Sequence, residues 1–445
     1  MKSRTTAKVL AVLLAVAFVG AACGGDDDDT AGTDDGGGGT EESIDYTSIG
    51  LWDDGACDTS KPKLSIGLMT VFESPVLSLK DQATALEASA EAFNKRGGAN
   101  GSCIEVHVCD DGANPDKAVG CVREIDQAGV VATVNDQGTV SQGEVSDAMA
   151  AAKIPRVAGN VTNADWDDPN AYPLDASGTG VTFLLPQALI NREIDKIAII
   201  RVDLAAASAM KGFLESIYEG EATFPADIPV PAGTTDFSQF ILAADDAGAD
   251  GATLAIGEQE AIQVVKAGQQ LNTELVLGSS LGTFSHANVT ELGDFAKQME
   301  FLWSFAPATT DLPVYQALRQ DLAASGDEAL QPENLKASPM RSWIGLYALL
   351  KMIRDAKMTD FTRDGITAML QQAKDVPMLD MFGGDNWTPN LDHPGLFKRA
   401  GIDHWSTYEW DPEASGEFEG NFKNTSDISF DKVMCGTPLG APQPC

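Results

Sequence analysis

The chain has 445 residues, and its 66 acidic residues against 30 basic ones give a formal net charge of −36. A chain this acidic repels phosphate groups, so its charge argues against nucleic-acid binding and against adhesion to anionic membranes. The length suits two domains or more.

The first residues have the pattern of a secretory signal. Lys2, Arg4 and Lys8 precede an apolar run over 9–19, which is too short to span a bilayer comfortably. The run ends in VGAAC, which resembles the lipobox of bacterial lipoproteins. This resemblance implies a signal peptide over 1–22, cleavage before Cys23 and lipidation of its thiol. A plain signal peptide cleaved at small residues is the alternative.

An acidic, glycine-rich stretch follows the cysteine. Residues 24–42 are of low complexity and cannot bury a core, and their like charges extend the chain. A solvated spacer explains the aspartate run better than a metal site, because nothing there fixes a coordination geometry. We therefore expect a tether over 23–60 and contact with the membrane through the lipid anchor only. The predicted location is the extracytoplasmic face of the bacterial cell membrane.

Six cysteines remain after the tether begins, and an even number in an exported chain suggests disulfides. Fifteen pairings are possible for six cysteines. The pairs we consider are Cys109 with Cys121, which is local, Cys57 with Cys103, and Cys435 with Cys445. Zinc binding is disfavoured because no CxxC spacing occurs and histidine is scarce. We expect neither a metal nor a cofactor.

Strand and helix patterns alternate through the first part of the chain. Apolar strands are predicted at 63–71 and within 101–111, and helices at 76–96 and from Pro115, capped by Asn114, to about 129. Residues 130–163 then read as strand, loop, helix, strand, loop. Short apolar runs between helices indicate a parallel sheet covered on both faces, which binds ligands beyond the carboxyl ends of its strands.

Two loops of that stretch form one half of a predicted small-molecule site. Both follow strands and are rich in small polar groups, and Ser141 lies near a helix start, which favours an anion. Ordinary turn and cap chemistry is the alternative explanation. The candidate residues of the two loops are Gln137, Gly138, Ser141, Asn160, Val161 and Thr162.

A second alternating series follows an irregular segment at 163–180, the end of which we interpret as the first crossover. Strands are predicted near 194–203, 228–230, 251–257, 275–279 and 299–305, with helices near 205–218, 238–247 and 260–271 between them. Helical patterns over 314–324, 341–356 and 363–373 are assigned to the first half of the structure. The predicted fold is α/β with two similar doubly wound lobes: lobe 1 over 61–178 and 308–377, and lobe 2 over 179–307 and 378–445.

Several strings within this pattern resemble a known family. They are IGLMTV in the first strand, EAFNKRGGANG at the end of the next helix, CDD, NPDKA, IP at 154–155 and TDFS at 235–238. Together they resemble the substrate-binding proteins of branched-chain amino acid ABC transporters, which have the type I periplasmic-binding-protein fold. The resemblance covers most of residues 61–373.

The resemblance implies two lobes joined by three crossovers, which close on a ligand by hinge motion. It also implies a monomer that delivers a small molecule to an ABC permease. The two loops above would hold a carboxylate, and Glu258 would meet an ammonium group; Glu258 could instead only start its helix. Ser74 and Asp203 complete the candidates. The family usually carries an aromatic residue within 203–206, and its absence here leaves the solute open among amino acids, amides and related carboxylates.

Two other functions are considered. Residues 278–282 match the G-x-S-x-G pattern of serine hydrolases, with Ser280 as the nucleophile, but no helical pattern follows the serine directly. A sensory ligand-binding protein that acts through a separate receptor is the second alternative. We predict that the protein is not an enzyme.

Overall fold

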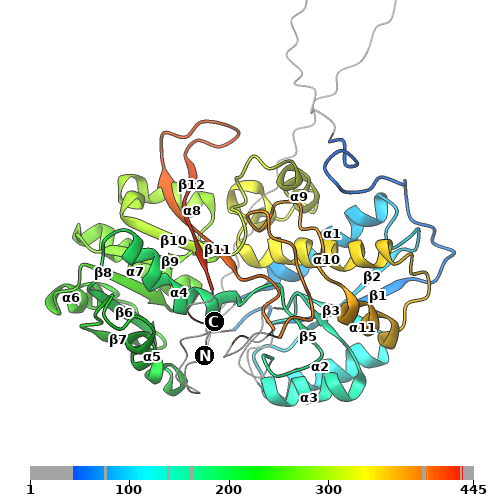
Figure 1. The fold of residues 1–445 in the computed structure, drawn as a ribbon, viewed down its shortest axis with the longest axis horizontal. Coiled ribbons are helices and arrows are strands. Elements are labelled where there is room, and N and C mark those ends of the chain that lie inside the picture. The colour runs from blue at the N-terminus through cyan, green and yellow to red at the C-terminus, as the bar shows by residue number, and fades with distance from the viewer. Residues whose placement is uncertain are drawn as a thin grey trace, which may run out of the picture. The chain divides into compact units, whose positions relative to one another are not determined.

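The computed structural model describes residues 44–74, 78–137, 141–159, 165–392, 397, 399–430 and 433. The described part contains two β-sheets, each flanked by helices (Figure 1). The first sheet and the helices within 80–152 and 313–372 are called the first lobe below. The second sheet and the helices within 177–292 are called the second lobe.

The first sheet is parallel, with strand order β2-β1-β3-β4-β5. Six of the seven residues of β1 are buried, as expected for a strand covered on both faces. Asn114 caps α2 by accepting hydrogen bonds from the amides of Asp116 and Lys117, which confirms the predicted helix start. The elements are β1 (Leu64–Thr70), α1 (Lys80–Lys95), β2 (Ile104–Asp110), α2 (Pro115–Gln127), β3 (Ala132–Val134), α3 (Gln142–Ala152), β4 (Arg156–Val157) and β5 (Ala171–Tyr172).

The second sheet has the order β12-β11-β10-β9-β8-β6-β7, and β11 runs antiparallel to both of its neighbours, β10 and β12, while the other pairs are parallel. Its elements are α4 (Ser177–Asn191), β6 (Ile197–Val202), α5 (Met210–Ile217), β7 (Asp227–Val230), α6 (Ser238–Asp246), β8 (Gly251–Ala255), α7 (Glu258–Leu271), β9 (Val276–Ser280), α8 (His286–Leu292), β10 (Met299–Trp303), β11 (His404–Asp411) and β12 (Asn421–Ser429).

Two parts of the structure differ from the sequence-based expectation. The segment 163–180 was expected to be irregular, but β5 lies within it and α4 begins at Ser177. Helix α4 is apolar around most of its circumference, so it lacks the one-sided pattern that marks a surface helix. The hairpin of β11 and β12 was not predicted either, because its antiparallel strands join a sheet whose other strands are far away in the sequence.

Three helices after β10 belong to the first lobe. They are α9 (Pro313–Ala323), α10 (Ala337–Asp355) and α11 (Arg363–Gln372), and α10 packs on both α1 and β3. A β-carbon on Gly345 would lie 2.7 Å from the Cβ of Ala158, so glycine permits this close approach of α10. The chain therefore connects the lobes at 173–176, at 304–312 and after α11, as the type I fold requires.

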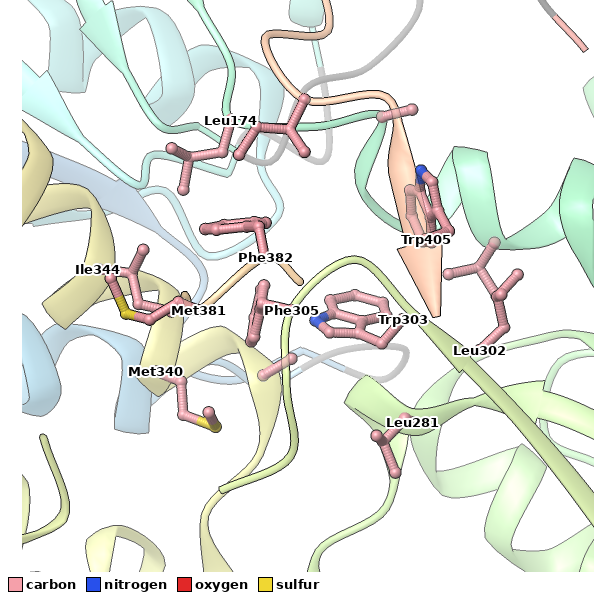
Figure 2. Close-up of a cluster of buried hydrophobic side chains, with 14 of the residues drawn as sticks. Leu174, Leu281, Leu302, Trp303, Phe305, Met340, Ile344, Met381, Phe382 and Trp405 are labelled. Carbon is pink, nitrogen blue, oxygen red and sulfur yellow. The ribbon is translucent and has the colours of Figure 1, made fainter. Parts of the chain in front are cut away.

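Aromatic and aliphatic side chains fill the region where these connections meet. Figure 2 shows Phe305 and Phe382 between Ile344 of α10 and Trp303 of β10, with Trp405 of β11 nearby. The ring centroids of Phe305 and Phe382 are 5.6 Å apart, and those of Trp303 and Trp405 are 6.1 Å apart. One apolar core thus continues from lobe to lobe.

Two disulfides lie in the first lobe. They join Cys57 to Cys103 and Cys109 to Cys121, which are two of the pairings considered from the sequence. Cys23, Cys435, Cys445 and the predicted signal peptide lie outside the described residues. Within the described part of the chain, the helices are too short or too polar to cross a membrane.

Candidate functional site

A cavity of about 410 Å³ lies between the two lobes. The first lobe contributes Leu79, Gln137 and the first turns of α10, and the second lobe contributes residues at strand ends and the start of α4. Strands β6, β8 and β9 all run in the same direction, so their carboxyl ends meet at one edge. The cavity therefore has the position expected for a ligand site in a parallel sheet. The lining residues from the second lobe are Gly178, Val181, Thr182, Val202, Leu254, Ala255, Ile256, Gly257, Glu258, Ser280, Gly282, Thr283 and Trp303.

Two of the predicted ligand-binding residues, Gln137 and Glu258, line this cavity. The side-chain oxygen Oε1 of Gln137 is buried and has no hydrogen-bond partner among the described residues. Asp203 is exposed, and the described lining includes neither it nor Ser74 nor Ser141. The predicted residues Gly138, Asn160, Val161 and Thr162 lie outside the described residues.

A buried charge network joins described residues that flank the two loops selected by the sequence analysis. Arg156 of β4 donates from Nε to Asp136 Oδ2 at 2.7 Å and from Nη1 to Asp165. Asp136 begins the loop after β3, and Asp165 follows the loop after β4. Asp136 also accepts a bond from the Thr133 hydroxyl at 3.1 Å. The two carboxylates raise the pKa of the Arg156 guanidinium above its ordinary value against the opposing effect of burial.

An ion pair spans the cavity. Lys336, directly before α10, donates to Glu258 Oε1 at the start of α7. Asp81, in the first turn of α1, lies close enough to both charges for them to affect its pKa. Burial raises the pKa of Asp81 to about 6, while nearby Lys336 opposes the rise and Glu258 adds to it. Glu258 is thus engaged by a cation of the protein rather than standing free for a ligand ammonium group.

A second, fully buried ion pair forms part of the cavity wall. Arg341 of α10 donates from Nη2 to Asp175 Oδ2 at 2.9 Å. Asp175 also accepts bonds from the amide of Ser177 at 2.8 Å and from the hydroxyl of Ser304. Asp175 and Ser304 lie in two different connections between the lobes. Sequence analysis missed Arg341, because a lone arginine in an apolar helix gives no local signal of a cavity.

Ser280, the candidate nucleophile, ends β9 and also lines the cavity. Its Oγ accepts a hydrogen bond from the amide of Gly282 at 3.1 Å. The ring Nε2 of His286 lies 3.1 Å from the carbonyl oxygens of Glu419 and Gly420, and the ring Nε2 of His404 lies 3.4 Å from Asp427 Oδ1. These contacts go to groups other than Ser280.

Among the described residues, no group of three His, Cys, Asp or Glu side chains could hold a metal ion.

The fold and the cavity agree with the comparison with known families. Residues 63–396 match the model of the family described as "Periplasmic binding protein". The match spans well over half of the chain, so the protein belongs to this family. No curated protein matches the sequence.

Solved structures share the type I periplasmic binding fold. A fatty acid ABC transporter substrate-binding protein from Thermomonospora curvata is similar, with a TM-score of 0.69, 17% identity and 86% of this chain and 97% of that chain covered. A solute-binding protein from R. palustris in complex with 4-hydroxybenzoate has a TM-score of 0.66 and 15% identity, with 83% of this chain and 97% of that chain covered. A leucine-, isoleucine-, valine-, threonine- and alanine-binding protein from Brucella ovis has a TM-score of 0.66 and 13% identity, with 86% of this chain and 99% of that chain covered.

Proposed function

We propose that the protein is an extracytoplasmic lipoprotein that captures a small polar solute by hinge closure and delivers it to an ABC permease. The observation that carries the proposal is the cavity between the lobes, whose lining comes from both of them. A solute that contacts both lobes at once favours the closed arrangement, because only that arrangement supplies all the contacts. Delivery requires no chemical change in the solute.

The solute class we propose is an amino acid, an amide or a related carboxylate. Similar folds are described as binding fatty acids, 4-hydroxybenzoate or aliphatic amino acids, so the fold itself accommodates several kinds of acid. The cavity volume of about 410 Å³ falls in the range of small-molecule sites. Lipidation of Cys23 and a permease partner remain part of the proposal, supported by the sequence pattern and by the family.

A thermal-shift screen tests the proposal. Amino acids, amides, polyols and small acids are added singly, and a compound at 100 times its Kd should stabilise the fold by about 2.7 kcal/mol. A hit should also reduce the radius of gyration in small-angle scattering, as closure requires. If no compound from any class stabilises the protein, the proposed capture of a small polar solute is wrong.

The same hits separate the competing functions. A bound solute recovered unchanged after prolonged incubation supports transport, whereas its conversion by the wild type but not by Ser280→Ala would support a hydrolase. Co-purification of the membrane-anchored chain with a permease supports delivery. Co-purification with a sensory receptor instead would contradict it.

A further inference from the structure

Arg341 is the one arginine of the described cavity lining, and one of its two terminal nitrogens lacks a hydrogen-bond acceptor among the described residues. The residue is 2% exposed. Its Nη2 binds Asp175, but its buried Nη1 has no hydrogen-bond partner among the described residues. A buried N–H group without an acceptor destabilises the protein, and an acceptor on a bound molecule would remove that cost. The unpaired Nη1 is therefore a donor that an oxygen of the solute would satisfy on binding.

The guanidinium group is held in place before any solute arrives. Asp175 is itself bonded to Ser177 and Ser304, so the carboxylate that orients Arg341 cannot turn away easily. The rings of Phe305 and Trp303 lie 5.5 and 5.9 Å from the guanidinium carbon. The Ser177 amide and the Ser304 hydroxyl also stabilise the negative charge of Asp175. The positive charge of Arg341 can therefore also attract an anion. A fixed, planar guanidinium group is well suited to a carboxylate.

A second unpaired donor lies nearby. The indole Nε1 of Trp303 is buried without a hydrogen-bond partner in the described part of the chain. In Figure 2 the nitrogen of Trp303 is on the side that faces Phe305, the ring that Arg341 also contacts. Two donors, one of them charged, suit the two oxygens of one carboxylate.

Apolar side chains form part of the remaining cavity lining, beside the hydroxyl groups of Thr182, Ser280, Thr283 and Ser338. The apolar side chains include Leu79, Val181, Val202, Leu254 and Ile256. A smaller cavity of about 20 Å³ shares the lining residues Gly282, Trp303 and Ala337 with it and is also lined by Phe305 and Met340. Apolar walls of this kind favour a hydrocarbon body on the solute.

A carboxylate partner for an ammonium group is missing from the described lining. Glu258 is the lining carboxylate, and it is already paired with Lys336. Asp175 is completely buried and paired with Arg341. An amino acid would therefore place its ammonium group in the cavity without an available counter-charge.

We propose that Arg341 and Trp303 bind the carboxylate of the solute, and that the solute is an aromatic or aliphatic monocarboxylate without an α-ammonium group. This inference rests on the proposed function and narrows its solute class. It makes Arg341 the specificity-determining residue of the cavity.

Two matched triplets of compounds test the inference by isothermal titration calorimetry on the full-length protein. They are hexanoate, hexanamide and norleucine, and phenylacetate, phenylacetamide and phenylglycine. We expect at least one acid to bind, and its amide and its amino acid to bind about tenfold more weakly or worse. Tighter binding of either the amide or the amino acid would overturn the inference and leave solute capture intact. Binding by none of the six would also overturn it, and the wider screen would then decide on the proposed function.

Two variants test the named residues. Arg341→Lys keeps the charge but loses the planar fork, and Trp303→Phe keeps an aromatic ring but loses the N–H donor. Each should weaken binding of the acid about tenfold while changing the weak binding of the amide less than about threefold. Thr290→Ala, which removes a hydroxyl at an exposed position of α8 outside the described cavity lining, is the control. Equal losses for acid and amide would show a structural effect and contradict the assignment.

Discussion

Lys336 and Glu258 join the two lobes across the cavity by an ion pair, with the lysine directly before α10 and the glutamate in the first turn of α7. The two side chains are 24% and 28% exposed, so water screens their attraction. Pairs of this kind contribute roughly 0.2–1 kcal/mol. Because the partners belong to different lobes, this contribution favours the closed arrangement.

Lys336→Met should therefore shift the unliganded protein toward the open arrangement by up to about fivefold in population. Small-angle scattering measures the change as a larger radius of gyration. The double variant Lys336→Glu with Glu258→Lys should restore the wild-type value. Lys351→Met, which breaks an ion pair with Asp355 within α10, is the control. The interpretation is wrong if Lys336→Met and Lys351→Met have the same radius of gyration.

Gly282 of the second lobe lies close to Ala337 of the first lobe. A β-carbon there would lie 2.9 Å from the Cβ of Ala337 and 2.9 Å from a ring carbon of Trp303. Gly282→Ala should consequently destabilise the fold by about 1–3 kcal/mol and enlarge the radius of gyration. Urea unfolding and scattering measure the two effects. Gly212→Ala, in open space on α5, should be neutral or slightly stabilising; unchanged behaviour of Gly282→Ala would show that the lobes do not close this far in solution.

Arg156 binds the two aspartates that flank the loops after β3 and β4. Arg156→Leu leaves Asp136 and Asp165 buried without their cation, which should cost about 3–5 kcal/mol of unfolding free energy. Chemical denaturation measures the loss. Lys153→Ala breaks an exposed pair with Asp364 and should change stability by less than about 1 kcal/mol. Similar values for the two variants would contradict the structural role of Arg156.

Glu300 of β10 gives the second lobe a pH-dependent stability. Burial raises the pKa of this carboxyl to about 8, against the effect of Arg192 at 3.3 Å. The folded state thus prefers the protonated acid, so this contribution is present below the unfolded pKa of about 4.5 and is lost as the pH rises toward 8. Glu300→Gln should match the wild type near pH 5 and exceed its melting temperature increasingly up to pH 9. Glu291→Gln, on exposed α8, should show no such trend, and a constant difference for Glu300→Gln would refute the assignment.

The sequence predicted features that depend on neighbours along the chain. The strand β1 and the capped start of α2 follow from apolar runs and from the Asn114–Pro115 pair, and both are observed. Gln137 was selected because it follows a strand of a predicted parallel sheet, and Glu258 because of the family resemblance; both line the cavity, and their contact with a ligand stays a prediction. These signals need only a few consecutive residues.

The remaining part of the site depends on contacts between distant segments. Arg341 acquires its significance only when α10 packs beside Asp175, which is 166 residues away in the sequence. Trp303 looks like an ordinary core residue until β10 is placed beside the cavity. The proposed solute class therefore comes from tertiary structure and not from any motif.

The segment that precedes β1 is fastened to the first lobe by several contacts. Cys57 is bonded to Cys103, Asp54 is paired with Arg354 of α10, and the guanidinium carbon of Arg96 lies 4.3 Å above the ring of Tyr46. Any pull on the chain ahead of residue 44 is thus borne by the first lobe. If the protein is tethered through Cys23, the tether holds the first lobe while the second lobe moves. Release of the solute would then depend on the surface that a transporter presents to the moving second lobe.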